Sequence, residues 1–164
     1  LGQWVIQDLD QMLLERYGPG EDTLGELIRR SGMETFREYE AEILEDFLSR
    51  QSSSDASNYI VALGGGTLGD SDHQRNWERF KESGGDETYV VWLDTPFEEC
   101  WRRIRGDSNR PLVNLGESGA KDLYERRCPI YRRADVVLNQ DQQEQLQRLE
   151  DLVFLFKRPI MGHE

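Results

Sequence analysis

The sequence is poor in cysteine and histidine, and it has no long apolar run. Two cysteines and two histidines occur among 164 residues, without the close spacing of a metal-binding motif. These numbers argue against a disulfide framework and against a zinc site, and they fit a reducing cytoplasm. No stretch approaches the roughly 20 apolar residues that a membrane-spanning helix needs, so we expect no membrane partner.

Positive charge is scarce as well. The chain carries 20 lysines and arginines against 32 aspartates and glutamates, which gives a net charge of −12. Such an excess argues against nucleic acid and against anionic membranes as partners. An acidic protein can still bind a small anion if its arginines gather in one place. Eight of them lie in one part of the chain: Arg102, Arg103, Arg105, Arg110, Arg126, Arg127, Arg132 and Arg133.

This arginine-rich part surrounds a stretch, 106–119, that is rich in Gly, Asn, Asp and Ser. A loop of this length in a compact domain is often a mobile active-site lid. The arginines either cover a solvated helix face or line an anion site. Because guanidinium is the usual bidentate partner of phosphate and carboxylate, we favour an anion-binding lid at about 106–119.

The rest of the chain is organised around residues 58–67, Asn-Tyr-Ile-Val-Ala-Leu-Gly-Gly-Gly-Thr. The apolar run is typical of a buried parallel strand. It leads directly into Gly64, Gly65 and Gly66, which leave the backbone bare, so that a ligand can approach the peptide N–H groups. A plain turn is the alternative. Three consecutive glycines at the carboxyl end of a strand favour a ligand loop.

Two carboxylates, Asp8 and Asp10, follow a first predicted strand at residues 4–8. Acids one residue apart can hold Mg²⁺ and orient a hydroxyl group. One of them can instead cap the helix predicted for 9–17, and the pair alone favours capping. Farther along, Arg37 and Glu40 share one face of a predicted helix, although most pairs of this spacing are surface ion pairs.

Strands alternate with helices throughout the chain. This order predicts one domain spanning residues 1–164, with an α/β fold of three α/β/α layers around a parallel sheet. Strands are expected at 4–8, 58–63, 88–94 and 134–138. Helices are expected at 9–17, 23–30, 33–50, 71–81, 95–105, 120–133 and 142–156.

Taken in order, the motifs of this chain resemble those of shikimate kinase. They are Asp8-Leu9-Asp10, Phe36-Arg37-Glu38-Tyr39-Glu40, Leu63-Gly64-Gly65-Gly66, Val91-Trp92-Leu93-Asp94, Arg110-Pro111-Leu112 and Arg127-Cys128-Pro129-Ile130-Tyr131. The resemblance covers nearly the whole chain. It implies a P-loop kinase-like fold of the nucleoside monophosphate kinase type. It also implies transfer of the γ-phosphoryl group of ATP to the 3-hydroxyl of shikimate, in aromatic amino acid biosynthesis.

The resemblance also implies roles for single residues on the shikimate side. Asp10 looks like the carboxylate that binds the shikimate hydroxyls and orients or deprotonates the nucleophile. Arg37, held by Glu40, and Arg127 look like two clamps on the shikimate carboxylate. The turn at Gly64, Gly65 and Gly66 looks like the shikimate-side loop, with Gly65 as the expected backbone donor.

On the nucleotide side, Arg110 looks like the lid arginine that reaches the transferring phosphate. Arg103 is the candidate for stacking on adenine, and Asp8 looks like the acid that holds Mg²⁺ through water. The implied partners are therefore shikimate and ATP, with Mg²⁺ as cofactor. We expect a monomer in the cytoplasm.

The chain departs from the family pattern at its start. The family opens with a strand, a Walker A loop of the form G-x-x-x-x-G-K-[ST] and a helix, but neither Gly-Lys-Ser nor Gly-Lys-Thr occurs here. We therefore expect a kinase domain with its first strand and Walker A absent, which binds shikimate better than ATP and turns over slowly or not at all. Two alternatives stay open: a non-catalytic shikimate kinase-like binding or regulatory protein, and a related small-molecule kinase such as a gluconate kinase.

Overall fold

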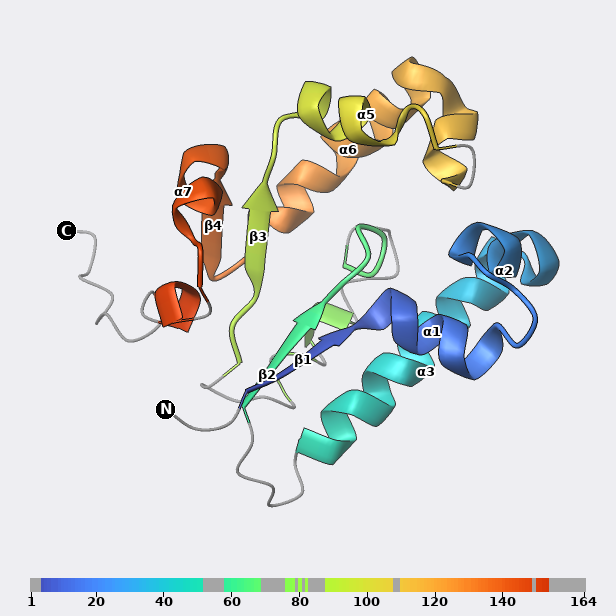
Figure 1. Cartoon of the computed structure of the whole chain (residues 1–164), viewed down its shortest axis with the longest axis horizontal. Coiled ribbons are helices and arrows are strands. Elements are labelled where there is room, and N and C mark those ends of the chain that lie inside the picture. Colours follow the sequence, from blue (N-terminus) through green and yellow to red (C-terminus); the bar gives the residue numbers. More distant parts are fainter. Residues whose placement is uncertain are drawn as a thin grey trace.

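The computed structural model describes residues 4–51, 58–68, 76–78, 80, 82, 88–107, 110–148 and 150–153. Strands and helices are interspersed along the described part of the chain (Figure 1). The elements are β1 (Trp4–Asp8), α1 (Leu9–Tyr17), α2 (Leu24–Ser31), α3 (Met33–Gln51), β2 (Asn58–Ala62), β3 (Val91–Asp94), α5 (Phe97–Ile104), the 3₁₀ helix η2 (Pro111–Leu115), α6 (Gly116–Tyr131), β4 (Val136–Asn139) and α7 (Gln140–Gln145). Much of the helix predicted at 71–81 lies outside the described residues.

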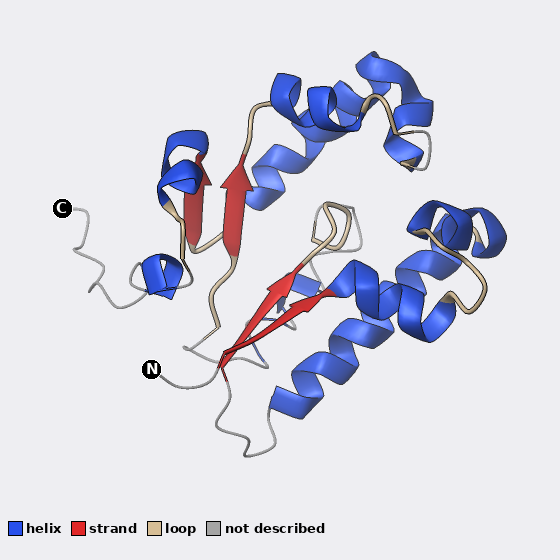
Figure 2. Ribbon diagram, in the orientation of Figure 1, coloured by secondary structure: helices blue, strands red, loops and turns tan. Residues whose placement is uncertain are grey.

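All strand pairings among the described residues are parallel, as predicted. β1 pairs with β2 from Trp4 opposite Asn58 to Asp8 opposite Ala62. β3 pairs with β4 over four residues on each strand. Within the described part of the chain the strands form two separate two-stranded sheets instead of one continuous sheet, with helices packed around both (Figure 2). The α/β fold class is therefore confirmed, and the register sets the carboxyl ends of β1 and β2 side by side.

The amino-terminal helices begin where their sequence signals indicate. Thr23 and Glu26 form a complete capping box at the start of α2, in which the Glu26 N–H donates to Thr23 Oγ1 over 3.2 Å and the Thr23 N–H donates to Glu26 Oε2 over 3.1 Å. The reciprocal bonds satisfy two backbone donors that a helix start leaves unpaired. α1 has the predicted bounds, and α3 ends within one residue of its predicted end.

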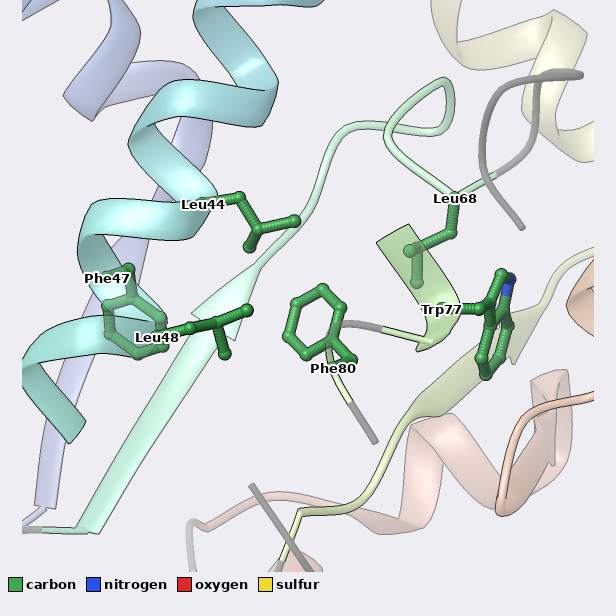
Figure 3. Close-up of a cluster of buried hydrophobic side chains, with 6 residues drawn as sticks. All are labelled: Leu44, Phe47, Leu48, Leu68, Trp77 and Phe80. Atoms are coloured by element: carbon green, nitrogen blue, oxygen red, sulfur yellow. The ribbon is translucent and has the colours of Figure 1, made fainter. Parts of the chain in front are cut away.

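Two apolar clusters pack these helices against one another and against β2 and the residues that follow it. The first packs α3 side chains against residues that follow β2 (Figure 3), and it consists of Leu44, Phe47, Leu48, Leu68, Trp77 and Phe80. The second joins α1, α2 and α3 and consists of Leu9, Leu13, Leu27, Phe36 and Ile43. A fully buried side chain of this size contributes about 1.5–3 kcal/mol, so these clusters fix the start of α1 and the middle of α3 beside the end of β2.

Two segments differ from the sequence prediction. Residues 111–119 were expected to belong to a loop, but they form η2 and the first turn of α6, which therefore begins at Gly116 and not at residue 120. Pro111 is preorganised for a first helical turn, and Gly116, at a φ of 70°, makes the break between η2 and α6. Residues 106, 107 and 110 are non-helical, and whether this segment acts as a lid remains a prediction.

The helix predicted at 142–156 is also wrong in its extent. α7 begins two residues earlier and ends at Gln145, and a separate helical segment covers residues 150–153. The carboxylate of Asp151 accepts hydrogen bonds from the backbone N–H groups of Gln147 and Arg148, over 3.2 and 3.0 Å. The side chain thus reaches back to N–H groups three and four residues earlier, as the acidic residue of a capping box does, and gives the backbone an alternative to continuous helical pairing. None of the described helices is long and apolar enough to cross a membrane.

Candidate active site

The three glycines after β2 lead into a tight turn that buried side chains hold in place. The Thr67 N–H donates to the Gly64 carbonyl over 3.0 Å. The Thr67 side chain is fully buried, and its hydroxyl donates to Glu40 Oε1 over 2.8 Å. From the other side, Asn76 Nδ2 donates to the Thr67 carbonyl over 3.0 Å. The backbone of the turn is therefore anchored to Glu40 of α3 on one side and to Asn76, which follows the turn in the chain, on the other.

Arg37 and Glu40 lie on α3 and face this turn. The Arg37 Nη1 donates to Glu40 Oε2, and the Glu40 residue is only 3% exposed, so this is not the surface ion pair of the alternative interpretation. The two oxygens of Glu40 hold Arg37 on one side and Thr67 on the other. A Cβ built on Gly66 would overlap the Arg37 guanidinium, so only glycine leaves that guanidinium in its place.

Asp10 reaches the same turn from the first turn of α1. A Cβ built on Gly64 would lie 3.2 Å from Asp10 Oδ1, which shows how closely the carboxylate approaches the bare backbone. Burial raises the pKa of Asp10, and the carboxylates of Asp8 and Glu40 raise it further, while the Arg110 guanidinium lowers it. Asp10 is therefore a carboxylate with raised basicity, set between two other acids and one arginine.

Asp8 performs the capping role that the acid pair favoured. It is the N-cap of α1, and its Oδ1 accepts the Asp10 N–H over 2.9 Å. Among the described residues, no group of three or more acidic, histidine or cysteine side chains could hold a metal ion. Mg²⁺ commonly binds one or two carboxylates together with substrate phosphates and water. Asp8 thus fits Mg²⁺ as a single protein ligand beside a phosphate, through its second carboxylate oxygen.

α6 brings two further side chains to the turn. Arg127 is 8% exposed, and a Cβ built on Gly65 would lie 3.6 Å from its Nη1. One helical turn later, the Tyr131 hydroxyl donates a hydrogen bond to the Gly65 carbonyl. In Figure 1 the loop after β2 lies between the amino-terminal helices and α6, which agrees with these contacts. Asp10, Arg37 and Arg127 therefore surround one glycine turn, although they come from three helices.

The remaining predicted arginines are at the surface. Arg110 precedes η2, and its side chain is 60% exposed and pairs with Asp107, with Nε and Oδ2 3.4 Å apart. Its charge nevertheless lowers the pKa of Asp10, so the guanidinium lies near enough to that carboxylate to act on it. Arg103 lies on α5 and donates from Nε to Glu99 Oε1 over 2.7 Å. Together with Arg102 it lowers the pKa of Glu99 to about 2, and no contact between described residues joins Arg103 to the glycine turn.

Three residues of this site had no role in the sequence analysis: Thr67, Asn76 and Tyr131. Thr67 directly follows the glycines, and Tyr131 belongs to the last motif, so both stood in stretches that the sequence singled out. Their hydroxyls act on partners far along the chain, 27 residues away for Thr67 and 66 for Tyr131. No local pattern encodes such a partner. Nothing in the sequence marked Asn76.

Comparison with solved structures first defines the fold of this chain as that of a small α/β kinase. The crystal structure of shikimate kinase from Aquifex aeolicus matches with a TM-score of 0.64 and 22% identity, over 93% of this chain and 83% of that chain. Shikimate kinase from Acinetobacter baumannii in complex with shikimate matches with a TM-score of 0.69 and 26% identity, over 94% of this chain and 80% of the other.

Comparison of the sequence makes the assignment specific. The family model of shikimate kinase matches residues 3–154. The shikimate kinase of Persephonella marina is 31% identical over 146 residues, which cover 89% of this chain and 79% of the relative. The chain belongs to the shikimate kinase family, as its motifs indicated.

Proposed function

We propose that this chain binds shikimate at the glycine turn, and that the reaction of this site is transfer of the γ-phosphoryl group of ATP to the 3-hydroxyl, slow in this chain because its sequence offers no Walker A lysine. One observation carries the proposal: Asp10, Arg37 and Arg127 converge on a turn of three glycines from three separate helices. Two guanidinium groups suit a carboxylate, and one carboxylate suits neighbouring hydroxyl groups. A small hydroxylated acid has this combination of groups, and shikimate is bound in the structural relative from Acinetobacter baumannii.

In this proposal the side chains act by positioning and by charge. Arg37 and Arg127 hold the shikimate carboxylate, and Glu40 and Thr67 keep Arg37 in place. Asp10 accepts a hydrogen bond from the 3-hydroxyl, and its raised pKa makes it a better proton acceptor as the oxygen attacks. Phosphoryl transfer needs alignment and neutralisation of charge more than covalent chemistry, so these roles suffice on the shikimate side.

The nucleotide side rests on fewer residues. The charge of Arg110 acts on Asp10, and its side chain is exposed enough to reach a transferring phosphate. Arg103 remains the proposed contact for adenine. Mg²⁺, when bound between Asp8 and the phosphates, would neutralise charge on the nucleotide. We further propose that the protein acts as a cytoplasmic monomer. Both of its cysteines are free, which suits a reducing compartment.

Calorimetry with shikimate tests the binding half of the proposal. Wild-type protein is expected to bind shikimate and to bind gluconate much more weakly, because the two fixed arginines suit a carboxylate held on a rigid ring, whereas open-chain gluconate loses more conformational freedom on binding. Replacing buried Arg127 by Met should weaken shikimate binding about tenfold or more, since hydrogen bonds to a charged group are worth about 1.5–3 kcal/mol. Its exposed neighbour Arg126 loses the same charge in Arg126→Met and should leave the affinity unchanged. Equal losses in both variants would contradict the site.

A coupled assay with ATP and Mg²⁺ tests phosphoryl transfer separately. Release of ADP that depends on shikimate, and that falls in Asp10→Asn, would support the enzymatic half of the proposal. Shikimate binding without any turnover would favour the non-catalytic binding protein, and stronger binding of gluconate than of shikimate would favour the related small-molecule kinase.

A further inference from the structure

We infer that Tyr131 is a positioning residue that locks the peptide between Gly65 and Gly66, so that the Gly66 N–H stays directed at the bound substrate. The inference rests on the proposed function for the identity of that substrate, and it adds the N–H of Gly66 to that of Gly65, the backbone donor that the family resemblance implied. It starts from one contact: the phenol of Tyr131, at the end of α6, donates its hydrogen to the Gly65 carbonyl.

The carbonyl of Gly65 and the N–H of Gly66 belong to one planar trans peptide unit and point in opposite directions. A bond that holds the oxygen therefore also fixes the direction of the N–H. Among the described residues, no group accepts a hydrogen bond from the N–H of Gly66, although Gly66 itself is buried. A buried N–H usually has a partner, so a ligand oxygen is a fitting acceptor here.

A lock is needed at this position because both flanking residues are glycines. Glycine has broad freedom in φ and ψ, so a Gly-Gly peptide can turn over with little steric cost. If this peptide turned over, the carbonyl of Gly65 would take the place of the N–H of Gly66. The carboxylate of an anionic ligand would then meet an acceptor where it needs a donor. The hydroxyl of Tyr131 opposes this change.

The ring of Tyr131 is itself held by its surroundings. It packs beside Trp92 of β3, with ring centroids 5.7 Å apart. Arg127 lies four residues earlier on the same face of α6, and both side chains approach Gly65. α6 thus brings both the Arg127 guanidinium and the Tyr131 hydroxyl to the same turn. Aromatic packing already restricts the ring. The hydrogen bond from the Tyr131 hydroxyl to the Gly65 carbonyl therefore costs little further side-chain entropy.

The chain offers a matched control on the same helix. Tyr124 also donates its hydroxyl hydrogen to a backbone carbonyl, that of Thr95, over 3.0 Å. This contact lies at the end of β3 and not at the glycine turn. Tyr131→Phe and Tyr124→Phe each remove one hydroxyl group and its hydrogen bond to a backbone carbonyl while keeping the ring. They should lower the urea midpoint of unfolding to a similar degree.

Shikimate binding separates the two variants. We expect Tyr131→Phe to raise the dissociation constant for shikimate about 3- to 10-fold, the range for loss of one hydrogen bond, and Tyr124→Phe to leave it within about twofold of wild type. Equal dissociation constants in the two variants, with wild type binding normally, would overturn the role of Tyr131 and leave the proposed function standing.

The amide resonance of Gly66 in a ¹⁵N-labelled protein gives a readout that needs no ligand. In free Tyr131→Phe this resonance should broaden through exchange between the two peptide orientations, while in Tyr124→Phe it should match wild type. If wild type failed to bind shikimate, the proposed function would fall, and this resonance would still decide whether Tyr131 locks the peptide. An unbroadened Gly66 signal in Tyr131→Phe would refute the lock.

Discussion

Replacement of Thr67 by Val is expected to destabilise the protein and weaken the site at the same time. Thr67 is fully buried, and its hydroxyl donates to Glu40 Oε1 over 2.8 Å. Val has nearly the same shape, so the change removes the hydrogen bond with little change in packing. It leaves a carboxylate oxygen of Glu40, a residue only 3% exposed, without this donor. A hydrogen bond to a charged group contributes about 1.5–3 kcal/mol, and we expect a loss of this size.

Urea unfolding measures the loss directly. For a small domain the free energy of unfolding changes by about 1–3 kcal/mol per molar urea, so a loss of about 2 kcal/mol lowers the midpoint by about 1 M. The loss should be nearly the same at low and high salt, because a buried pair is screened much less than a surface pair. Since Glu40 also holds Arg37, the affinity for shikimate should fall in the same variant.

Two further variants isolate this interaction. Thr67→Ser keeps the hydroxyl and should retain most of the shikimate affinity, although it loses a methyl group. In a Glu40→Gln background Thr67→Val should cost less than in wild type, because a bond to a neutral amide is worth only about 0.5–1.5 kcal/mol. A Thr67→Val protein with the wild-type midpoint, or with no coupling to Glu40, would refute the reasoning.

Three other perturbations test separate features. The pKa of Asp10 is raised in the folded protein, so the contribution of this carboxyl group to stability should decline as the pH rises above its ordinary value of about 3.9. Asp10→Asn should therefore gain stability relative to wild type between pH 4 and pH 7 in urea unfolding. Gly66→Ala should displace the Arg37 guanidinium and weaken shikimate binding about tenfold by calorimetry, with little further effect in an Arg37→Met background. Thr23→Ala should remove the capping box of α2 and cost about 1 kcal/mol in thermal or urea unfolding, and an unchanged midpoint would contradict that role.

Much of the fold could be predicted from sequence patterns that involve only neighbouring residues. The capping box at Thr23 and the helical spacing of apolar residues in α3 depend on neighbours three or four positions apart, and both predictions were confirmed. The prediction of a helix at 142–156 was wrong because the side chain of Asp151 replaces helical bonds near Arg148. Such competition between a side chain and the backbone has no strong marker in the sequence.

Part of the candidate site could be predicted from the sequence. The glycines, the acid pair and the arginines are present in the sequence, and their order pointed to the family to which the chain belongs. The sequence does not indicate which of these arginines is buried. Arg126 and Arg127 are chemically identical neighbours, and only the rotation of α6 about its axis buries Arg127 and exposes Arg126. Arg103 remained tied to Glu99 on α5, a pairing that its spacing allowed but did not require.

The sequence by itself determined the local conformations and the chemical groups available to the protein: a bare glycine turn, helix caps, parallel strands and a stock of carboxylates and guanidiniums. Only the tertiary structure decided which of these groups meet. Glu40 joins Thr67 across 27 positions and Tyr131 joins Gly65 across 66, because apolar clusters and parallel pairing bring α3, β2 and α6 together. The physical reason is that local conformation follows from contacts within one helical turn or strand, whereas the site depends on packing between elements that are remote in the chain.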